Sequence, residues 1–451
     1  MDEPRSRSTP STHAPRLVTR MPGFLDLLRR NRNYRLAWTG QVVSEIGDHF
    51  NNIAVFSLAL ATTRSGLVVS GVMLARAIPA VLAGPLAGVV LDRMDRRAVM
   101  VTSDLVRAVV AVGFVLTVHQ SRPWLLYALS GLLMFASPFF TSGRAAILPR
   151  VASPEELHTA NALTQTTQWT TTAIGTLLGG FSAARFGYTA AFVLNSLSFV
   201  FSAWVISRME LRGERVQRSD RTMSEADVMR PFRDYAEGLR YLRSQPLMLA
   251  IALLGVGWAS GGGAAQILFS LFGEIVFDRG PSGIGTIWAA AGFGLIVGGA
   301  VAHRIGPRLS FRSYKRTVAA CYLLHGGAYV LFSQSRRFST ALVWIALSRA
   351  AVAISSVLNW SLLLRHVDAS FRGRVFATNE SLVWATMMLS MLAAGVASQS
   401  VDPRIIGAVS GVVSSLTAVY WMWADRAGLL VEPTSAGTDP DEVELRIKVR
   451  A

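Results

Sequence analysis

The chain has 451 residues, of which 51% are hydrophobic and only 16% charged, with a formal net charge of +16. Soluble domains carry about a quarter charged residues, and a water-soluble fold of this size could not hide so many apolar side chains. The composition therefore excludes an ordinary soluble protein and favours an all-α membrane protein. The basic residues lie in short clusters between apolar runs and not on one face, which argues against a nucleic-acid partner.

Residues 1–33 are polar, rich in arginine and without an apolar core, so they do not form a cleavable signal peptide. We expect a disordered cytoplasmic tail here. It should end in a short amphipathic segment around Phe24, Leu27 and Leu28 that lies on the membrane surface.

A helix needs about 20 apolar residues to cross the hydrocarbon core of a bilayer. The sequence predicts twelve such spans, at 36–61, 67–91, 98–118, 124–142, 160–183, 187–207, 247–272, 282–302, 317–333, 339–363, 376–398 and 404–424.

The lysines and arginines orient these spans. With both termini in the cytoplasm, 34 of the 44 lie in cytoplasmic segments and 7 in the opposite loops, as the positive-inside rule requires. We therefore predict a multi-pass protein of the cell membrane. Its parts are an N-terminal six-helix bundle (34–208), a charged cytoplasmic linker (209–245), a C-terminal six-helix bundle (246–425) and a cytoplasmic C-terminal tail (426–451).

The linker has a helical pattern of its own. Phe232, Tyr235, Leu239 and Leu242 recur at helical spacing, which indicates a helix along the cytoplasmic surface. A wholly disordered linker is the alternative.

The two predicted bundles repeat one motif after their second span. Shifted by 211 residues, GVVLDRMDRR at 88–97 falls on GAVAHRIGPR at 299–308. Such parallel repeats are typical of transporters, with the pathway between the two halves.

The first copy of this motif forms a tight turn with its own chemistry. Asp92 can face the positive end of a nearby helix, while Arg93, Arg96 and Arg97 can face helix-end carbonyls or an acid. Gly88 would let another helix approach closely. We expect a cluster that holds one side of the protein closed; the alternative is that the arginines only set the topology.

Ionisable residues at membrane depth are functional candidates by default. Glu45, Asp48 and His49 share one face of the first span, and a carboxylate facing a cavity there can take up a proton. We expect Asp48 first and Glu45 second to couple to protons or to recognise a cation. The alternative is that they cap a turn or pair with Arg76.

We make three further predictions for residues inside the spans: for one charge pair, for two isolated arginines and for one glycine-rich stretch. Asp104 and Arg107 are three residues apart in the third span, so we expect them to neutralise each other. Arg76 and Arg349 have no partner nearby in the sequence, and Arg349 is the better candidate for binding an anionic substrate or for a switching partner. The glycine-rich stretch 259–266 in the seventh span suggests a bend for gating, or else close helix packing.

The motif at 88–97 resembles the major facilitator superfamily, whose members carry G-x-x-x-D-R-x-G-R-R between spans 2 and 3. Gly88, Asp92, Arg93, Arg96 and Arg97 match it, and Asp95 replaces the second glycine. The stretches 30–48 and 148–163 resemble the subgroup that contains macrolide efflux pumps and the enterobactin exporter. The resemblance covers about residues 24–425.

This resemblance implies two pseudo-symmetric six-helix bundles with alternating access, and a first span that lines the central cavity. Exporters of the superfamily often carry G-P-x-x-G-G in span 5. Here the segment holds Gly175, Thr176, Gly179 and Gly180. Because threonine replaces proline, the case for proton-coupled antiport is weakened, while the glycines still allow close packing.

The predicted function is secondary transport: export of an amphipathic small molecule, such as an antibiotic, drug or secondary metabolite, by proton antiport. The protein would act as a monomer in the lipid bilayer, with protons and the substrate as its ligands. A siderophore or lysophospholipid transporter is an alternative, and a non-transporting sensor or scaffold is another. No metal-ligand spacing, nucleotide-binding loop or nucleophile motif is present, so we expect no metal, no cofactor and no enzymatic activity.

Overall fold

The computed structural model describes residues 23–119, 122–210, 225–367 and 371–432. Residues 1–22 and 433–451, which make up most of the two predicted tails, lie outside the described residues. The described part of the chain contains helices and no strand, which confirms the all-α prediction.

The first part of the chain forms seven helices. They are α1 (Phe24–Arg30), α2 (Arg32–Thr63), α3 (Gly66–Arg93), α4 (Arg96–Gly113), α5 (Val115–His119), α6 (Pro123–Val151) and α7 (Pro154–Ser207).

The second part begins with α8 (Glu225–Ser244). It continues with α9 (Pro246–Leu271), the π-helical turn η1 (Phe272–Val276), α10 (Gly280–Ile305), the 3-10 turn η2 (Gly306–Arg308), α11 (Phe311–Gln334), α12 (Phe338–His366), α13 (Arg372–Ala397) and α14 (Pro403–Arg426).

Within the described ranges, nine helices are long and apolar enough to cross a membrane. One of them, α7, has 54 residues, and Gly187 at φ 82°, ψ 168° interrupts it where two spans were predicted to meet. This left-handed backbone favours glycine. Two more predicted spans correspond to α2 and α11, which are long enough but more polar. A helix therefore occupies each of the twelve predicted spans.

The helices differ from the predicted spans mainly at their ends. α6 continues to Val151, although the predicted span ended at 142. Hydropathy marks only the apolar part of a helix, and polar residues such as Arg144 extend it further. The glycine-rich stretch 259–266 does not bend: α9 stays helical, and a Cβ at Gly261 or Gly263 would lie 2.3 Å from a backbone oxygen of α14 or α13. These glycines serve close packing.

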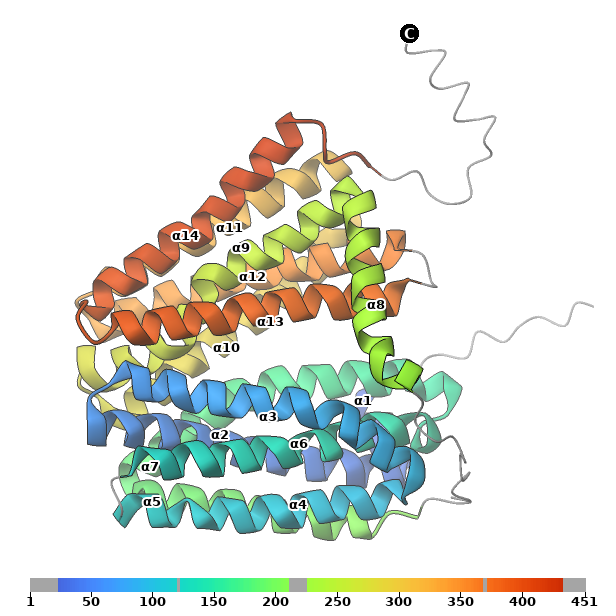
Figure 1. Cartoon of the computed structure of the whole chain (residues 1–451), viewed down its shortest axis with the longest axis vertical. Coiled ribbons are helices and arrows are strands. Elements are labelled where there is room, and N and C mark those ends of the chain that lie inside the picture. Colours follow the sequence, from blue (N-terminus) through green and yellow to red (C-terminus); the bar gives the residue numbers. More distant parts are fainter. Residues whose placement is uncertain (1–22, 120–121, 211–224, 368–370, 433–451) are drawn as a thin grey trace, which may run out of the picture.

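The helices form two halves, which lie one above the other in Figure 1. In the N-terminal half α2 packs on α7, and α6 packs on α3 and α4; in the C-terminal half α10 and α11 pack on α12, and α9 packs on α13 and α14. The halves meet where α7 packs on α10 and α3 on α13. Large apolar side chains such as Val109 and Leu389 are exposed on the outside, as lipid contact requires.

Two short helices lie at one end of the molecule, which we call the α8 end (Figure 1). α1 occupies the segment predicted to lie on the membrane surface; its Leu27 is fully buried, whereas Phe24 is exposed. α8 occupies most of the linker. Arg374 of α13 forms an ion pair of 3.0 Å with Glu237 of α8, and Tyr241 stacks on Phe371 at 4.9 Å between ring centroids.

Candidate functional site

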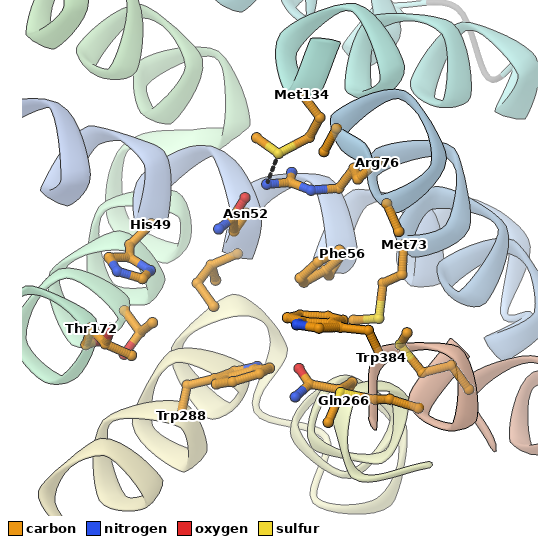
Figure 2. Close-up of a pocket in the computed structure, with 16 residues that line it drawn as sticks. His49, Asn52, Phe56, Met73, Arg76, Met134, Thr172, Gln266, Trp288 and Trp384 are labelled. Carbon is orange, nitrogen blue, oxygen red and sulfur yellow. Dashed lines mark hydrogen bonds between the residues drawn. The ribbon is translucent and has the colours of Figure 1, made fainter. Parts of the chain in front are cut away.

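A cavity of about 390 Å³ lies between the two halves. Its walls come from α2, α3, α6 and α7 on one side and from α9, α10 and α13 on the other (Figure 2). The lining residues are His49, Asn52, Ile53, Phe56, Met73, Arg76, Ala77, Ala80, Met134, Thr172, Thr176, Gln266, Trp288, Trp384, Met387 and Met391.

The lining is mostly apolar, with aromatic rings and four methionines. Methionine adapts its shape to different ligands, and a few polar groups in an apolar pocket set the orientation of what binds. Asn52 and Gln266 supply amides, and Arg76 is the one residue of the set with a permanent charge. None of the sixteen is an acid.

Arg76 has little to bind in this cavity. Its Nη2 lies 3.8 Å from the sulfur of Met134, a weak acceptor, and its Nη1 is buried without a hydrogen-bond partner. Asp48 attracts it electrostatically, but the two residues do not form the ion pair that the sequence left open as an alternative.

Glu45 is held by three neighbours. Gln41 Nε2 donates to Glu45 Oε1 at 2.8 Å, Arg144 Nη1 lies 3.3 Å from the same oxygen, and Thr171 donates to Oε2 at 2.8 Å. These residues belong to α2, α6 and α7. The carboxylate is therefore already paired and ties three helices together.

Asp48 faces a different group. It lies 3.9 Å from Arg107 of α4, and Arg107 also forms an ion pair with Asp104, as their spacing in the sequence suggested. The rings of Phe140 and Phe199 lie 4.6 Å and 4.4 Å from the guanidinium carbon. One buried cation is thus shared by two carboxylates, of which Asp104 is 0% exposed and Asp48 25%. We call Asp48, Asp104 and Arg107 the N-half charge cluster.

Arg349 does not line the cavity. It is 6% exposed on α12, and its guanidinium lies 5.1 Å from the ring centroid of Phe269. Beside it, His325 Nδ1 lies 2.7 Å from the Ser348 hydroxyl. No carboxylate in the described ranges forms an ion pair with Arg349. Arg349 is thus buried beside Phe269 and is not among the residues that line the cavity. A role for it toward substrate stays a prediction.

The motif at 88–97 lies at the α8 end, between α3 and α4. Asp95, which replaces the motif's second glycine, caps α4 by accepting a hydrogen bond from the Arg97 backbone at 2.9 Å. Arg96 donates to the Ala146 carbonyl at 3.1 Å, and Arg97 to the Met209 carbonyl at 2.8 Å. The two arginines therefore fasten α4 to α6 and to the end of α7.

The other motif residues are more exposed than we expected. A Cβ at Gly88 would find no atom within 4 Å, so the close helix approach predicted there is absent in this conformation. Asp92 and Arg93 are exposed at the end of α3. Gly88 thus has open space beside it, and this could not be predicted from the motif.

The glycines of α7 pack against α2 and α10. A Cβ at Gly175 would lie 2.8 Å from His49, and one at Gly179 would lie 2.9 Å from the His49 carbonyl. A Cβ at Gly180 would lie 2.9 Å from the backbone of Gly285. Gly180 and Gly285 therefore let the two halves touch backbone to backbone.

A second contact between the halves was not predicted. Ser57 of α2 donates a hydrogen bond of 2.6 Å to Glu274 in η1, and its oxygen lies 3.1 Å from the Tyr188 hydroxyl. Glu274 follows a predicted apolar span in the sequence, so the sequence places it in a loop. Nothing in the sequence places it beside Ser57.

The two stretches that carry the subgroup resemblance pack together. Asn31 Nδ2 donates to the Val151 carbonyl at 2.6 Å and to Glu156 at 3.0 Å, and the Tyr34 hydroxyl donates to the Ala160 carbonyl at 2.9 Å. Residues 30–48 and 148–163 thus form one structural unit at the α8 end.

No cluster of three or more His, Cys, Asp or Glu that could hold a metal ion occurs among the described residues. Glu45, Asp48 and Asp104 are instead engaged with arginines. Partners such as Arg144, Thr171, Phe140 and Phe199 were missed from the sequence, because helix rotations decide which residues of different spans meet.

Curated proteins similar to this chain are transporters. The chain is 24% identical to an uncharacterised transporter, YfiS, of Bacillus subtilis, over 91% of this chain and 98% of that protein. It is 23% identical to the putative bacilysin exporter BacE of Bacillus subtilis (86% and 93% covered). It is also 23% identical to macrolide efflux protein A of Streptococcus pyogenes (79% and 86% covered).

Solved structures share the fold. A bacterial homolog of the human lysosomal transporter Spinster, in an inward-facing and occupied conformation, superposes with a TM-score of 0.65 at 13% identity, over 90% of this chain and 99% of that one. The nucleoside transporter NupG superposes with a TM-score of 0.61 at 11% identity, over 87% and 99%. The family model of the Major Facilitator Superfamily matches residues 37–380, and the chain belongs to this superfamily of membrane transporters.

Proposed function

We propose that this protein exports an amphipathic small molecule, such as an antibiotic or another secondary metabolite, across the cell membrane. The observation that carries the proposal is the cavity between the halves, because residues of both halves wall it. Rocking of the halves would expose such a site to one side of the membrane and then to the other. Two of the three named relatives are described as a putative exporter and an efflux protein, which supports the outward direction.

We propose proton antiport as the driving force, with the N-half charge cluster as the proton site. Asp48 is the most exposed of its three members. A proton on Asp48 would remove its attraction to Arg107 and leave that cation with Asp104 alone. Asp48 neighbours His49 in α2, and His49 lines the cavity, so this change would reach the substrate site directly.

In this proposal, contacts between helices near the α8 end and near the opposite end of the molecule close the cavity to one side of the membrane or the other. Both termini and the α8 end would face the cytoplasm, as the arginine distribution favours. Ser57 and Glu274 would hold the outer side closed in the present conformation, and their hydrogen bond would break when that side opens. The protein would work as a monomer, since the cavity takes all its walls from one chain.

The test is efflux of a fluorescent dye from cells that express the wild-type protein or the Asp48→Asn variant. We expect the wild-type protein to lower dye accumulation, and collapse of the proton gradient to abolish the effect. Asp48→Asn should lose most of the pH-driven rate, because an amide cannot take up and release the proton, while the purified protein stays folded.

Asp26→Asn is the matched control, because Asp26 is an exposed acid of α1 far from the cluster. It should transport at the wild-type rate. If Asp48→Asn retained a wild-type response to the pH gradient, the assigned proton site would be wrong. If no dye or antibiotic were moved by the wild-type protein, a sensor or scaffold role would replace the transport proposal.

A further inference from the structure

We propose that the substrate carries an anionic group, a carboxylate or a similar oxyanion, which binds Arg76, and a flat apolar part that packs on Trp288 and Trp384. This inference rests on the proposed function, because it takes the cavity between the halves as the substrate site. It names the chemical class of substrate that the cavity would bind.

The first observation is the unmatched charge of Arg76. It lines an apolar cavity that has no acidic side chain among its sixteen lining residues, its Nη1 has no hydrogen-bond partner, and its Nη2 meets only the Met134 sulfur. A cation in such surroundings loses solvation without gaining a counter-ion. An anionic ligand would supply the missing charge.

The second observation is that the nearest acid is already engaged. Asp48 attracts Arg76 electrostatically but forms its ion pair with Arg107. Glu45 is held by Gln41, Arg144 and Thr171. Arg76 is therefore available to a ligand, and a guanidinium binds a carboxylate through two parallel hydrogen bonds.

The third observation is the opposite wall. In Figure 2 Arg76 projects from α3 on the N-terminal side, while the rings of Trp288 and Trp384 project from the C-terminal half across the cavity. Trp384 is 52% exposed, and Trp288 Nε1 has no hydrogen-bond partner. A molecule with an anionic end and a flat apolar body would touch both halves at once.

Charge also favours the proposed direction. The interior of a cell is electrically negative, so the membrane potential itself drives an anion outward. In exchange of an entering proton for a leaving anion, the membrane potential would drive the movement of both charges.

The experiment measures binding of 2-naphthoate and of its neutral isostere 2-naphthamide to the purified full-length protein in lipid nanodiscs. Intrinsic tryptophan fluorescence reports binding, and empty nanodiscs correct for partition into lipid. We expect the wild-type protein to bind the naphthoate about tenfold more tightly than the naphthamide, a difference of roughly 1.4 kcal/mol.

Arg76→Gln should bind the two compounds equally, and Arg76→Lys should recover part of the preference because it restores the charge. Arg243→Gln is the control, since Arg243 is an exposed arginine of α8 outside the cavity, and it should keep the wild-type preference. Thermal unfolding of each variant checks its fold; if Arg76→Gln does not fold, the comparison of Arg76→Lys with the wild-type protein decides.

Equal binding of the two compounds by the wild-type protein, absence of naphthoate binding, or an unchanged preference in the Arg76 variants would overturn the proposal. Transport is measured separately. A protein that prefers the naphthoate through Arg76 but moves no dye supports this inference and contradicts the proposed export. A protein that exports dye without this preference supports the proposed export and contradicts this inference.

Discussion

Among the residues that the structure describes, one arginine side chain in each half is almost wholly buried, and the two have different surroundings. Arg107 in the N-terminal half is 3% exposed and meets two carboxylates, Asp48 and Asp104, between two phenyl rings. Arg349 in the C-terminal half is 6% exposed and lies over the ring of Phe269, with no carboxylate paired to it in the described ranges.

The two buried arginines therefore differ in whether a proton on a neighbouring acid can change their charge balance. A proton on Asp48 or Asp104 changes the net charge of the N-half charge cluster, because it leaves the Arg107 cation with a single ionised carboxylate. Arg349 lies over an aromatic ring and beside His325, and no carboxylate in the described ranges pairs with it. Within the described part of the chain, only the N-terminal half has a buried arginine that is shared by two carboxylates.

The largest expected effect comes from removing the cation of the N-terminal half. Arg107→Met would leave Asp48 and Asp104 buried without a counter-ion, and the loss of one partner from a buried pair costs about 3–5 kcal/mol. Unfolding of the purified protein in a detergent titration measures this loss. Adding Asp104→Asn to the same chain should recover part of it, because one unpaired carboxylate disappears. A stability equal to that of the wild-type protein would show that the cluster does not hold this half together.

A smaller effect tests the geometry of the two sites. Arg107→Lys keeps the charge but loses the planar group that stacks between Phe140 and Phe199 and reaches both acids, so we expect a loss of about 1–2 kcal/mol. Arg349→Lys is the matched change in the other half and should cost less, about 0.5–1 kcal/mol, because only the contact with Phe269 is altered. The same titration compares them, and a reversed order would contradict the assigned environments.

The smallest effect is expected when the C-terminal cation is removed. Arg349→Met should change the unfolding free energy by about 1 kcal/mol or less, since the lost contact with Phe269 is offset by relief of a buried unpaired charge. The contrast with Arg107→Met is the sharpest form of the comparison. A loss as large as that of Arg107→Met would mean that Arg349 has a counter-ion, such as a bound anion, in the folded protein.

Much of the fold could be predicted from the sequence, because membrane spans leave a one-dimensional signal of length and hydropathy. The break inside α7 illustrates this: the apolar pattern placed two spans there, and Gly187 interrupts the helix at that point. Contacts within one helix could also be predicted, as for Asp104 and Arg107, because three residues make nearly one helical turn.

Contacts between helices could not be predicted in this way. Gly88 belongs to a recognisable motif, yet no neighbouring atom lies within 4 Å of a Cβ built there. Arg349 and Arg76 look alike in the sequence, but only Arg76 lines the cavity. Hydropathy does not record how far each helix is rotated about its axis.

The sequence by itself determined that this chain is a helical membrane protein, where its spans lie, that its two halves repeat a motif, and which family it resembles. Only the tertiary structure decided that Asp48 meets Arg107, that Arg97 holds the end of α7, and that Arg76 and Trp288 line one cavity between the halves. The physical reason is that the bilayer selects each span by its own length and polarity, whereas a site forms between spans whose rotations and neighbours are chosen by packing.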